Sequence, residues 1–260
     1  MAAVEFHKKG KIAYITLNRP DQMNSMNLAV WEGMCDAWIR VRDDPEVWTA
    51  IVTGAGDKAF SAGADLKEMS ENRALIEKGI TPPARPEVGP MRGLYVWKPF
   101  IAAVNGFAMG GGFELALACD IRVAAEHAQF GFSEVLRAII PGAGGTQRLP
   151  RMAPFGMAID LLITGRRIDA QEAYRLGIVS KVVPLAKLMS TAEEYANMIN
   201  ENGPLAVRAI KESAYRGIQM SLDDGLRLEN LFSAIVRQTE DSREGPLAFA
   251  QKRKPSYKGK

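Results

Sequence analysis

Apolar and polar positions change their spacing along this chain, and the change predicts where strands give way to helices. Residues 3–17 carry two short runs rich in β-branched and aromatic residues around a polar turn, a pattern that predicts paired strands. Residues 48–56 and 99–109 are apolar runs that lead into glycines, as buried strands do. After Asn27 the apolar side chains recur at helical spacing, so a helix with Asn27 as its N-cap is expected.

The strand pattern stops near Pro184, and successive helical segments follow. We therefore predict two parts: residues 1–183, a strand-and-helix core in which we expect the functional site, and residues 184–260, a C-terminal helical region. Strands that alternate with helices imply a sheet largely covered by helices, so the predicted fold class is α/β. The polar, proline-bearing residues 70–92 predict a helix followed by a mobile loop.

The bulk composition limits the class of protein. The 260 residues, 47% of them hydrophobic, can form one large domain with a sizeable core. A net charge of +3 does not by itself indicate binding to nucleic acid or to a membrane surface. The N-terminus lacks the apolar segment of a signal peptide, no apolar run reaches about 18 residues, and the two cysteines predict buried thiols, so we expect a cytoplasmic location.

The chain lacks the residues that several common kinds of catalytic or binding site need. The two histidines, His7 and His127, are far apart, and no Cys/His spacing predicts a zinc site or another metal centre. The stretch at 59–63 misses the first glycine of the nucleophile elbow of serine hydrolases. The glycines at 106–112 do not have dinucleotide-loop spacing, and those at 142–145 lack the lysine of a P-loop, so a phosphate cradle is only weakly indicated.

One acid stands alone in an apolar stretch behind three glycines. Glu114 is the only charged residue between Phe100 and Cys119, and it follows the glycines at 110–112. Glycines at a helix start leave backbone N–H groups that a ligand can approach closely, and the helix dipole there favours an anion or a developing oxyanion. The apolar neighbours of Glu114 should raise its pKa and ease proton exchange.

A second acid, Glu134, lies 20 residues further along, after another glycine turn. A strand–turn–strand excursion between the two acids can return the chain to the glycine helix, and the turn at 61–65 offers another free N–H near Ala64. Two carboxylates beside an oxyanion site suit proton transfer next to a carbonyl group. Each acid also has a structural alternative: Glu114 as a partner of the helix dipole, and Glu134 in an ion pair with Arg137.

Residues 59–69, 98–124 and 130–151 together resemble the crotonase superfamily, and most closely the enoyl-CoA hydratases. The resemblance continues through residues 161–183 and 241–254, so it covers most of the chain in order. It implies a crotonase-like spiral of ββα turns followed by a C-terminal helical trimerisation region, assembled as a homotrimer or a homohexamer. It also implies an acyl-CoA thioester as the substrate, with neither a metal ion nor a redox cofactor.

The same resemblance assigns roles to residues of the predicted site. The backbone N–H groups of Ala64 and Gly111 would form an oxyanion hole for the thioester oxygen. Glu114 would assist the attack of water on Cβ, and Glu134 would deliver a proton to Cα. The backbone of Gly142 would help to order that water.

The resemblance also assigns the binding site of the CoA group. The nucleotide would lie along residues 62–67, with Lys58 and Lys67 near its phosphates. Lys252 would reach the CoA bound to a neighbouring subunit, and simple solubility is the alternative role of each lysine. The residues assigned to substrate binding are Lys58, Ala62, Ala64, Asp65, Leu66, Lys67, Gly111, Gly142 and Lys252.

The resemblance therefore implies a 2-enoyl-CoA hydratase, a lyase of the kind that acts in fatty acid β-oxidation. The nearest alternative is a Δ3-Δ2 enoyl-CoA isomerase, which needs mainly Glu134, and another crotonase-family lyase or dehydratase is a third. RNA binding, which some relatives show, is disfavoured by the weak net charge. The presence of both glutamates disfavours a purely structural trimer.

The position of Ala138 and the segment 70–97 depart from the family pattern. The family often has a glycine four residues after the second glutamate, where this chain has Ala138, preceded by Arg137. The change would reshape the pocket wall or hold Glu134 in an ion pair. Residues 70–97 match the family little, so the preferred acyl-chain length is not predicted.

Overall fold

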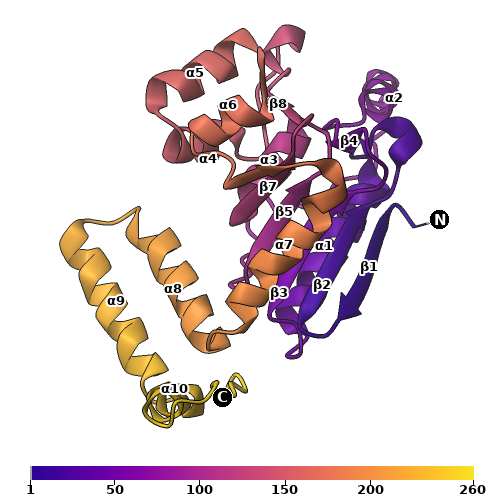
Figure 1. The fold of residues 1–260 in the computed structure, drawn as a ribbon. Helices are drawn as coiled ribbons and strands as arrows, with labels where there is room; N and C mark the ends of the chain where they lie inside the picture. Colours follow the sequence, from indigo (N-terminus) through magenta and orange to yellow (C-terminus); the bar gives the residue numbers. More distant parts are fainter. Residues whose placement is uncertain (1) are drawn as a thin grey trace.

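Two sheets of short strands form the centre of the protein (Figure 1). The structure is a computed structural model that describes residues 2–260. The larger sheet has the order β1-β2-β3-β5-β7-β10, and the smaller sheet has the order β4-β6-β8-β9. The larger sheet consists of β1 (Val4–Lys9), β2 (Ile12–Leu17), β3 (Thr49–Gly54), β5 (Phe100–Val104), β7 (Ile121–Ala125) and β10 (Lys181–Val183). The smaller sheet consists of β4 (Ala59–Ser61), β6 (Phe107–Met109), β8 (Gln129–Gly131) and β9 (Arg167–Asp169).

Three times in succession, a strand of the larger sheet is followed by a strand of the smaller sheet and then by a helix or helical turn. β3, β5 and β7 pair in parallel, as do β4, β6 and β8, so each repeat lies beside the one before it. Gly106, between β5 and β6, permits this stacking, because a Cβ there would lie 2.1 Å from the carbonyl oxygen of Lys58. The arrangement confirms the predicted spiral of ββα turns.

Ten α-helices cover the sheets or extend beyond them in the described part of the chain. They are α1 (Leu28–Asp43), α2 (Leu66–Glu77), α3 (Gly111–Ala118), α4 (Gly145–Met152), α5 (Phe155–Thr164), α6 (Ala170–Arg175), α7 (Leu185–Asn200), α8 (Pro204–Gly217), α9 (Leu222–Val236) and α10 (Glu240–Ala250). Two 3₁₀ turns, η1 (Pro20–Gln22) and η2 (Val135–Arg137), follow β2 and β8. The N-cap prediction for Asn27 is confirmed, since its side chain accepts a hydrogen bond from the Val30 amide at 3.1 Å.

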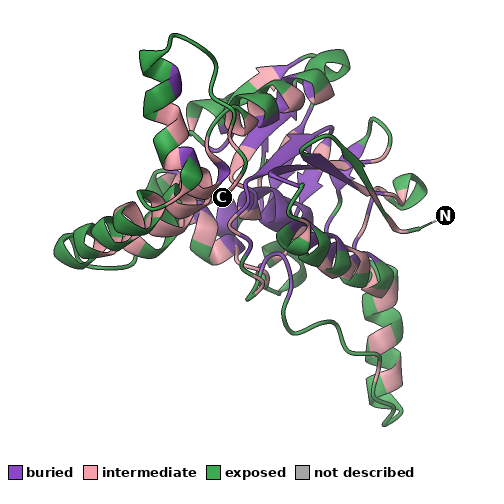
Figure 2. Cartoon of the chain, turned by 90° about the horizontal axis from the view of Figure 1, so that it is seen from below, coloured by how far each residue is buried: buried purple, intermediate pink, exposed green. Residues whose placement is uncertain are grey.

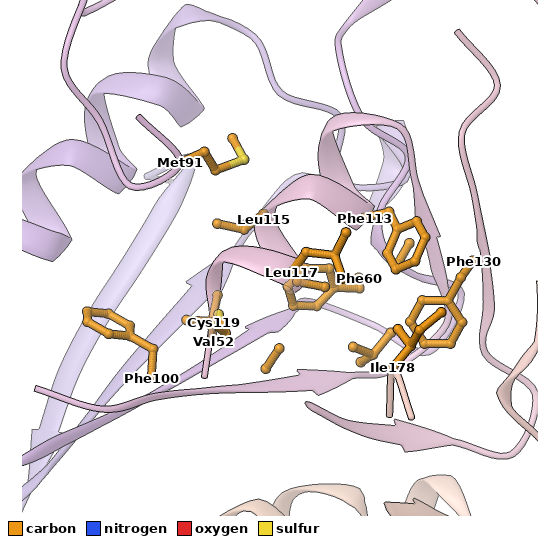
Figure 3. Packing of buried hydrophobic residues seen from close by; sticks show 14 of the residues in the cluster. Val52, Phe60, Met91, Phe100, Phe113, Leu115, Leu117, Cys119, Phe130 and Ile178 are labelled. Atoms are coloured by element: carbon orange, nitrogen blue, oxygen red, sulfur yellow. The ribbon is translucent and has the colours of Figure 1, made fainter. Parts of the chain in front are cut away.

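The main hydrophobic core surrounds α3, which is buried on nearly every side. Phe113 of this helix packs against Phe130 and Phe132, with ring centroids 5.3 and 4.8 Å apart. Figure 3 shows Phe113 and Leu117 of the same helix among the other buried side chains of the cluster. A helix that is apolar all round belongs in such a core, and this packing fixes the position of the glycines at its N-terminus.

α7 covers the opposite face of the larger sheet and forms a second, smaller core. Its Leu188 and Ala192 pack in one cluster with Ile51 of β3 and Ile101 of β5, whereas the alternate strand residues point into the main core. The helix lies beyond the predicted division at residue 183, yet it is a packed layer of the sheet (Figure 1).

α8, α9 and α10 extend away from the sheets (Figure 1), and Figure 2 shows that much of their surface is exposed. α8 and α9 pack against each other. The side chains of Ile210, Ile218, Leu222, Leu231 and Ile235 stay open to solvent. Where large apolar side chains are exposed in this number on two packed helices, another protein often covers them. Within residues 2–260, none of the helices combines the length and the apolar character that a bilayer-spanning segment needs.

Ala138, the residue that departs from the family pattern, ends η2 in the left-handed conformation with φ +56°. The Cβ atom makes this conformation sterically unfavourable for alanine, and glycine has no such steric penalty. We therefore expect Ala138→Gly to raise the free energy of unfolding by about 0.5–1 kcal/mol, measured by urea denaturation. Ala74→Gly, in the exposed interior of α2, is the matched control and should lower it. A lower stability of Ala138→Gly would contradict the argument.

Candidate active site

Two glycine turns from successive repeats meet at the N-terminus of α3. Gly63 has φ +88°, and a Cβ on it would lie 2.6 Å from the carbonyl oxygen of Met109 and 3.0 Å from the amide nitrogen of Gly111. Only glycine allows so close an approach. Ala64 comes next in the chain, and a Cβ built on Gly111 would lie 3.7 Å from the Ala64 amide nitrogen. The turn after β4 and the start of α3 are therefore in contact.

The amides of Ala64 and Gly111 are free to donate to a ligand. In the turn after β4, the neighbouring amide of Asp65 donates to the Met26 carbonyl oxygen at 3.2 Å, whereas the Ala64 amide has no acceptor among residues 2–260. Gly111 is the first residue of α3, where an amide has no acceptor inside the helix. The structure thus brings together the two N–H groups that the sequence analysis assigned to an oxyanion hole.

Glu114 lies one turn into α3 and is 3% exposed. Its Oε1 atom accepts two hydrogen bonds, from the amide of Ala143 at 2.7 Å and from that of Gly145 at 2.8 Å. Burial raises the pKa of Glu114, and the two amides together with the charges of Arg148 and Arg92 oppose that rise. The pKa is raised overall, as the apolar neighbours in the sequence predicted.

Glu134 follows β8 and directly precedes η2. A Cβ on Gly110 would lie 2.7 Å from its Oε1 atom, so the carboxyl group lies at the start of α3. Its Oε2 atom is buried and has no hydrogen-bond partner within residues 2–260. Burial, with a smaller contribution from the charge of Glu114, raises the pKa of Glu134 to about 7. A group with this pKa can hold or release a proton near neutral pH.

The ion pair between Glu134 and Arg137, which was the structural alternative for this acid, does not form among the described residues. Arg137 instead donates from Nη1 to the carbonyl oxygen of Ser133 at 3.0 Å, which closes the helical turn on itself. Its charge still lowers the pKa of Glu134, but less than burial raises it. The Oε2 atom of the carboxyl group therefore has no partner among the described residues.

The turn at 141–145 holds Glu114 in place, and the sequence analysis missed this role. Gly142 lies in the turn, as assigned, but the atoms that bind Glu114 are the amides of the next residue and of Gly145. Arg148 of α4 supports the turn by donating to the Ala143 carbonyl oxygen at 2.9 Å. The glycine run and the helix start after it were visible in the sequence, but they were considered as a weak phosphate cradle and as a backbone that orders water, not as the partner of Glu114.

A cavity of about 690 Å³ opens at this place, a size suited to a small-molecule ligand. Most of its lining is apolar and comes from both glycine turns, α2, η2 and β9. Of the predicted site residues, those that line it are Ala62, Ala64, Leu66 and Glu134. Gly110 also lines the cavity, and it joins the lining to the free amide of Gly111.

The predicted charged residues of the CoA site lie outside this lining. Lys58 and Lys67 are exposed, and Lys252 follows α10, which Figure 1 shows far from α2. A single chain thus does not bring Lys252 to the cavity. The Asp65 carboxylate accepts from Arg19 at 2.8 Å and from the Lys67 amide at 3.1 Å, so it is occupied in holding the turn and the start of α2.

The fold and the position of the site define the class of protein. The chain matches a solved enoyl-CoA hydratase from Bacillus anthracis with a TM-score of 0.88 and 42% identity, over 99% of this chain and 100% of that one. It therefore has the crotonase fold.

The model of the enoyl-CoA hydratase/isomerase family matches residues 7–260, and the chain belongs to this family. Similar relatives include the (E)-benzylidenesuccinyl-CoA hydratase of Thauera aromatica, 42% identical over 95% of this chain and 96% of the relative. Another is the short-chain-enoyl-CoA hydratase of Clostridium acetobutylicum, 43% identical over 96% of this chain and 95% of the relative.

Proposed function

We propose that the protein is a 2-enoyl-CoA hydratase, which adds water across the α,β double bond of an acyl-CoA thioester. Relatives named as hydratases, similar along almost the whole chain, support a hydro-lyase activity. The observation that carries the finer proposal is local. A buried carboxyl group, that of Glu114, and a half-buried one, that of Glu134, lie at the start of one helix beside the free amides of Ala64 and Gly111.

The free amides would stabilise the charge that forms during the reaction. When water attacks Cβ, electrons move toward the thioester carbonyl and its oxygen becomes negative. The N–H groups of Ala64 and Gly111 are held by rigid turns, so they can donate to this oxygen without reorganising. Removal of one such donor typically lowers kcat by about 10²–10³-fold. The α3 dipole adds positive potential at the same place.

The two carboxyl groups would divide the proton transfers. Glu114, whose Oε1 atom is engaged by two amides, keeps Oε2 to accept a proton from the attacking water. Glu134, with its pKa raised to about 7, is protonated in a large fraction of molecules and can give a proton to Cα. Unequal environments for two acids are the usual basis for an acid and a base in one site. The product would be a 3-hydroxyacyl-CoA.

The remaining assignments belong to the same proposal. Ala62 and Leu66 would contact the CoA group along the cavity, and Lys58, Lys67 and a neighbouring subunit's Lys252 would meet its phosphates. We propose no metal ion and no cofactor beyond the CoA of the substrate, and no nucleic-acid partner. The exposed apolar faces of α8 and α9 support a homotrimer or homohexamer. The cytoplasmic location and the place in β-oxidation stay predictions from the sequence.

Crotonyl-CoA tests the proposal directly. Purified protein should remove the absorbance of the conjugated thioester without added metal or nucleotide, and the mass of the product should increase by one water. A panel of short, long, branched and aromatic 2-enoyl-CoA substrates would identify the preferred acyl group. If no member of the panel loses absorbance at high enzyme concentration, the hydratase proposal is wrong. A 3-enoyl-CoA that gains absorbance would instead support the isomerase.

A further inference from the structure

A small loop, residues 89–94, packs against the turn at 141–145 that holds Glu114. The backbones of Gly89 and Arg92 exchange two hydrogen bonds, of 2.7 and 2.9 Å, which close the loop. Met91, in the middle of the loop, is buried in the main core (Figure 3) and anchors it there. The exposed side chain of Arg92 then reaches across and donates from Nη2 to the Gly142 carbonyl oxygen at 2.5 Å.

Arg148 makes a second connection between the loop and the turn. Its Nη2 atom donates to the Met91 carbonyl oxygen at 2.7 Å, and its Nη1 atom donates to the Ala143 carbonyl oxygen at 2.9 Å. The loop therefore meets the turn through two guanidinium groups, one from each side. Both guanidinium groups donate their charged N–H groups to backbone oxygens.

The Arg92 contact is made to the same peptide group that binds Glu114. The Gly142 carbonyl and the Ala143 amide belong to one peptide unit, whose oxygen accepts from Arg92 and whose N–H donates to Glu114 Oε1. A charged donor on the oxygen polarises the amide and strengthens the hydrogen bond from its N–H. The Gly145 amide has a different support, because its peptide oxygen accepts from the Arg148 amide in the first turn of α4.

We propose that Arg92 is a positioning residue that orients Glu114 and favours its ionised form through the peptide group between Gly142 and Ala143. The inference rests on the proposed hydratase function and deepens it, because it names what sets the proton acceptor. It also gives a role to the 89–94 loop, which lies in the part of the sequence that matches the family little. Because Arg92 belongs to this loop, a rearrangement of the loop would change how Glu114 is oriented.

The direction of the effect follows from the charges around Glu114. The charged groups that face it are Arg92 from the loop, Arg148 from α4 and Glu134 beside η2. The two arginines lower the pKa of Glu114, and Glu134 favours protonation of Glu114 when it is itself ionised. Without the Arg92 guanidinium, the pKa of Glu114 should rise. Because Glu114 must be deprotonated to accept a proton from water, the acid limb of the kcat profile should then move to higher pH.

The test compares Arg92→Met with Arg92→Lys. We expect Arg92→Met to lower kcat about tenfold at pH 6 and less at pH 8, with KM within about twofold, since a charged hydrogen bond is about twice as strong as a neutral one. Arg92→Lys keeps the charge and should recover part of the loss at pH 6. Arg73→Met, on the exposed face of α2, is the control and should not differ from wild type. An equal loss at every pH, or a change confined to KM, would overturn the proposal.

A second measurement does not depend on activity. In protein labelled with ¹³C at the glutamate carboxyl carbons, the Glu114 signal can be assigned by its absence from Glu114→Gln. Its titration midpoint should lie at higher pH in Arg92→Met than in wild type and in Arg73→Met. An unchanged midpoint would overturn the role of Arg92 even in an active hydratase. If no 2-enoyl-CoA is hydrated, the proposed function fails, while a shifted midpoint would still support the link from Arg92 to Glu114.

Discussion

Glu114→Gln is expected to lower kcat for the hydration of crotonyl-CoA by about 10²–10⁴-fold, the usual contribution of a general base or acid. The glutamine Oε1 atom can still accept from the amides of Ala143 and Gly145, so the turn should keep its position. The amide group cannot take a proton from water, which is the function assigned to the carboxylate. The rate is measured by the loss of thioester absorbance, and substrate binding by calorimetry with a saturated acyl-CoA.

Glu126→Gln is the matched control for this prediction. Glu126 is exposed in the turn between β7 and β8, outside the cavity, so the same change there should leave kcat and binding as in wild type. A loss of less than about tenfold in Glu114→Gln would speak against the hydratase. The protein would then fit an isomerase that needs mainly Glu134, and a 3-enoyl-CoA substrate would show this directly.

Glu134→Gln is expected to reduce kcat by a similar factor, about 10²–10⁴-fold, and also to change the shape of the pH profile. Glu134 must be protonated to give a proton to Cα, and its pKa is raised to about 7. The wild-type pH profile should therefore have an alkaline limb, along which the rate falls as the pH rises through about 7. Glutamine does not titrate, so the residual rate of the variant should lose this limb. Stopped-flow rates between pH 5 and pH 9 would measure both effects.

The two glutamine variants can be separated from a general loss of structure. The Glu134 Oε2 atom has no partner among the described residues, so its replacement by an amide breaks no hydrogen bond of that atom. We expect Glu134→Gln to unfold at no lower temperature than wild type, and to bind a saturated acyl-CoA normally. A variant that keeps the wild-type limb near pH 7 would show that another group controls it, and the assignment of Glu134 as the acid would be wrong.

Local features of the fold were predictable because they depend on residues that are near one another in the sequence. The cap at Asn27, the buried runs of β3 and β5, and the helices after Pro184 follow from spacing and composition over a few positions. The environment of Glu114 was predictable for the same reason, since its apolar neighbours bury it wherever the helix packs. Because several long motifs resemble the crotonase superfamily, the prediction could be extended from local elements to the whole spiral of ββα turns.

The contacts inside the site were not predictable in this way. Pairing of Glu134 with Arg137 was a reasonable expectation from their spacing, but the backbone bond from Arg137 to Ser133 replaces it. Ala138 was recognised as unusual, yet only its φ of +56° explains why glycine suits the position.

The sequence by itself determined that this chain alternates strands and helices, ends in helices, and carries two acids beside glycine turns. The tertiary structure decided which backbone groups meet those acids. The amides that bind Glu114 lie 29 and 31 positions away, and Arg92 reaches Gly142 across 50 positions. A hydrogen bond depends on distances within a few tenths of an ångström. Such precision over long separations is set only when the repeats, the loop and α4 pack together.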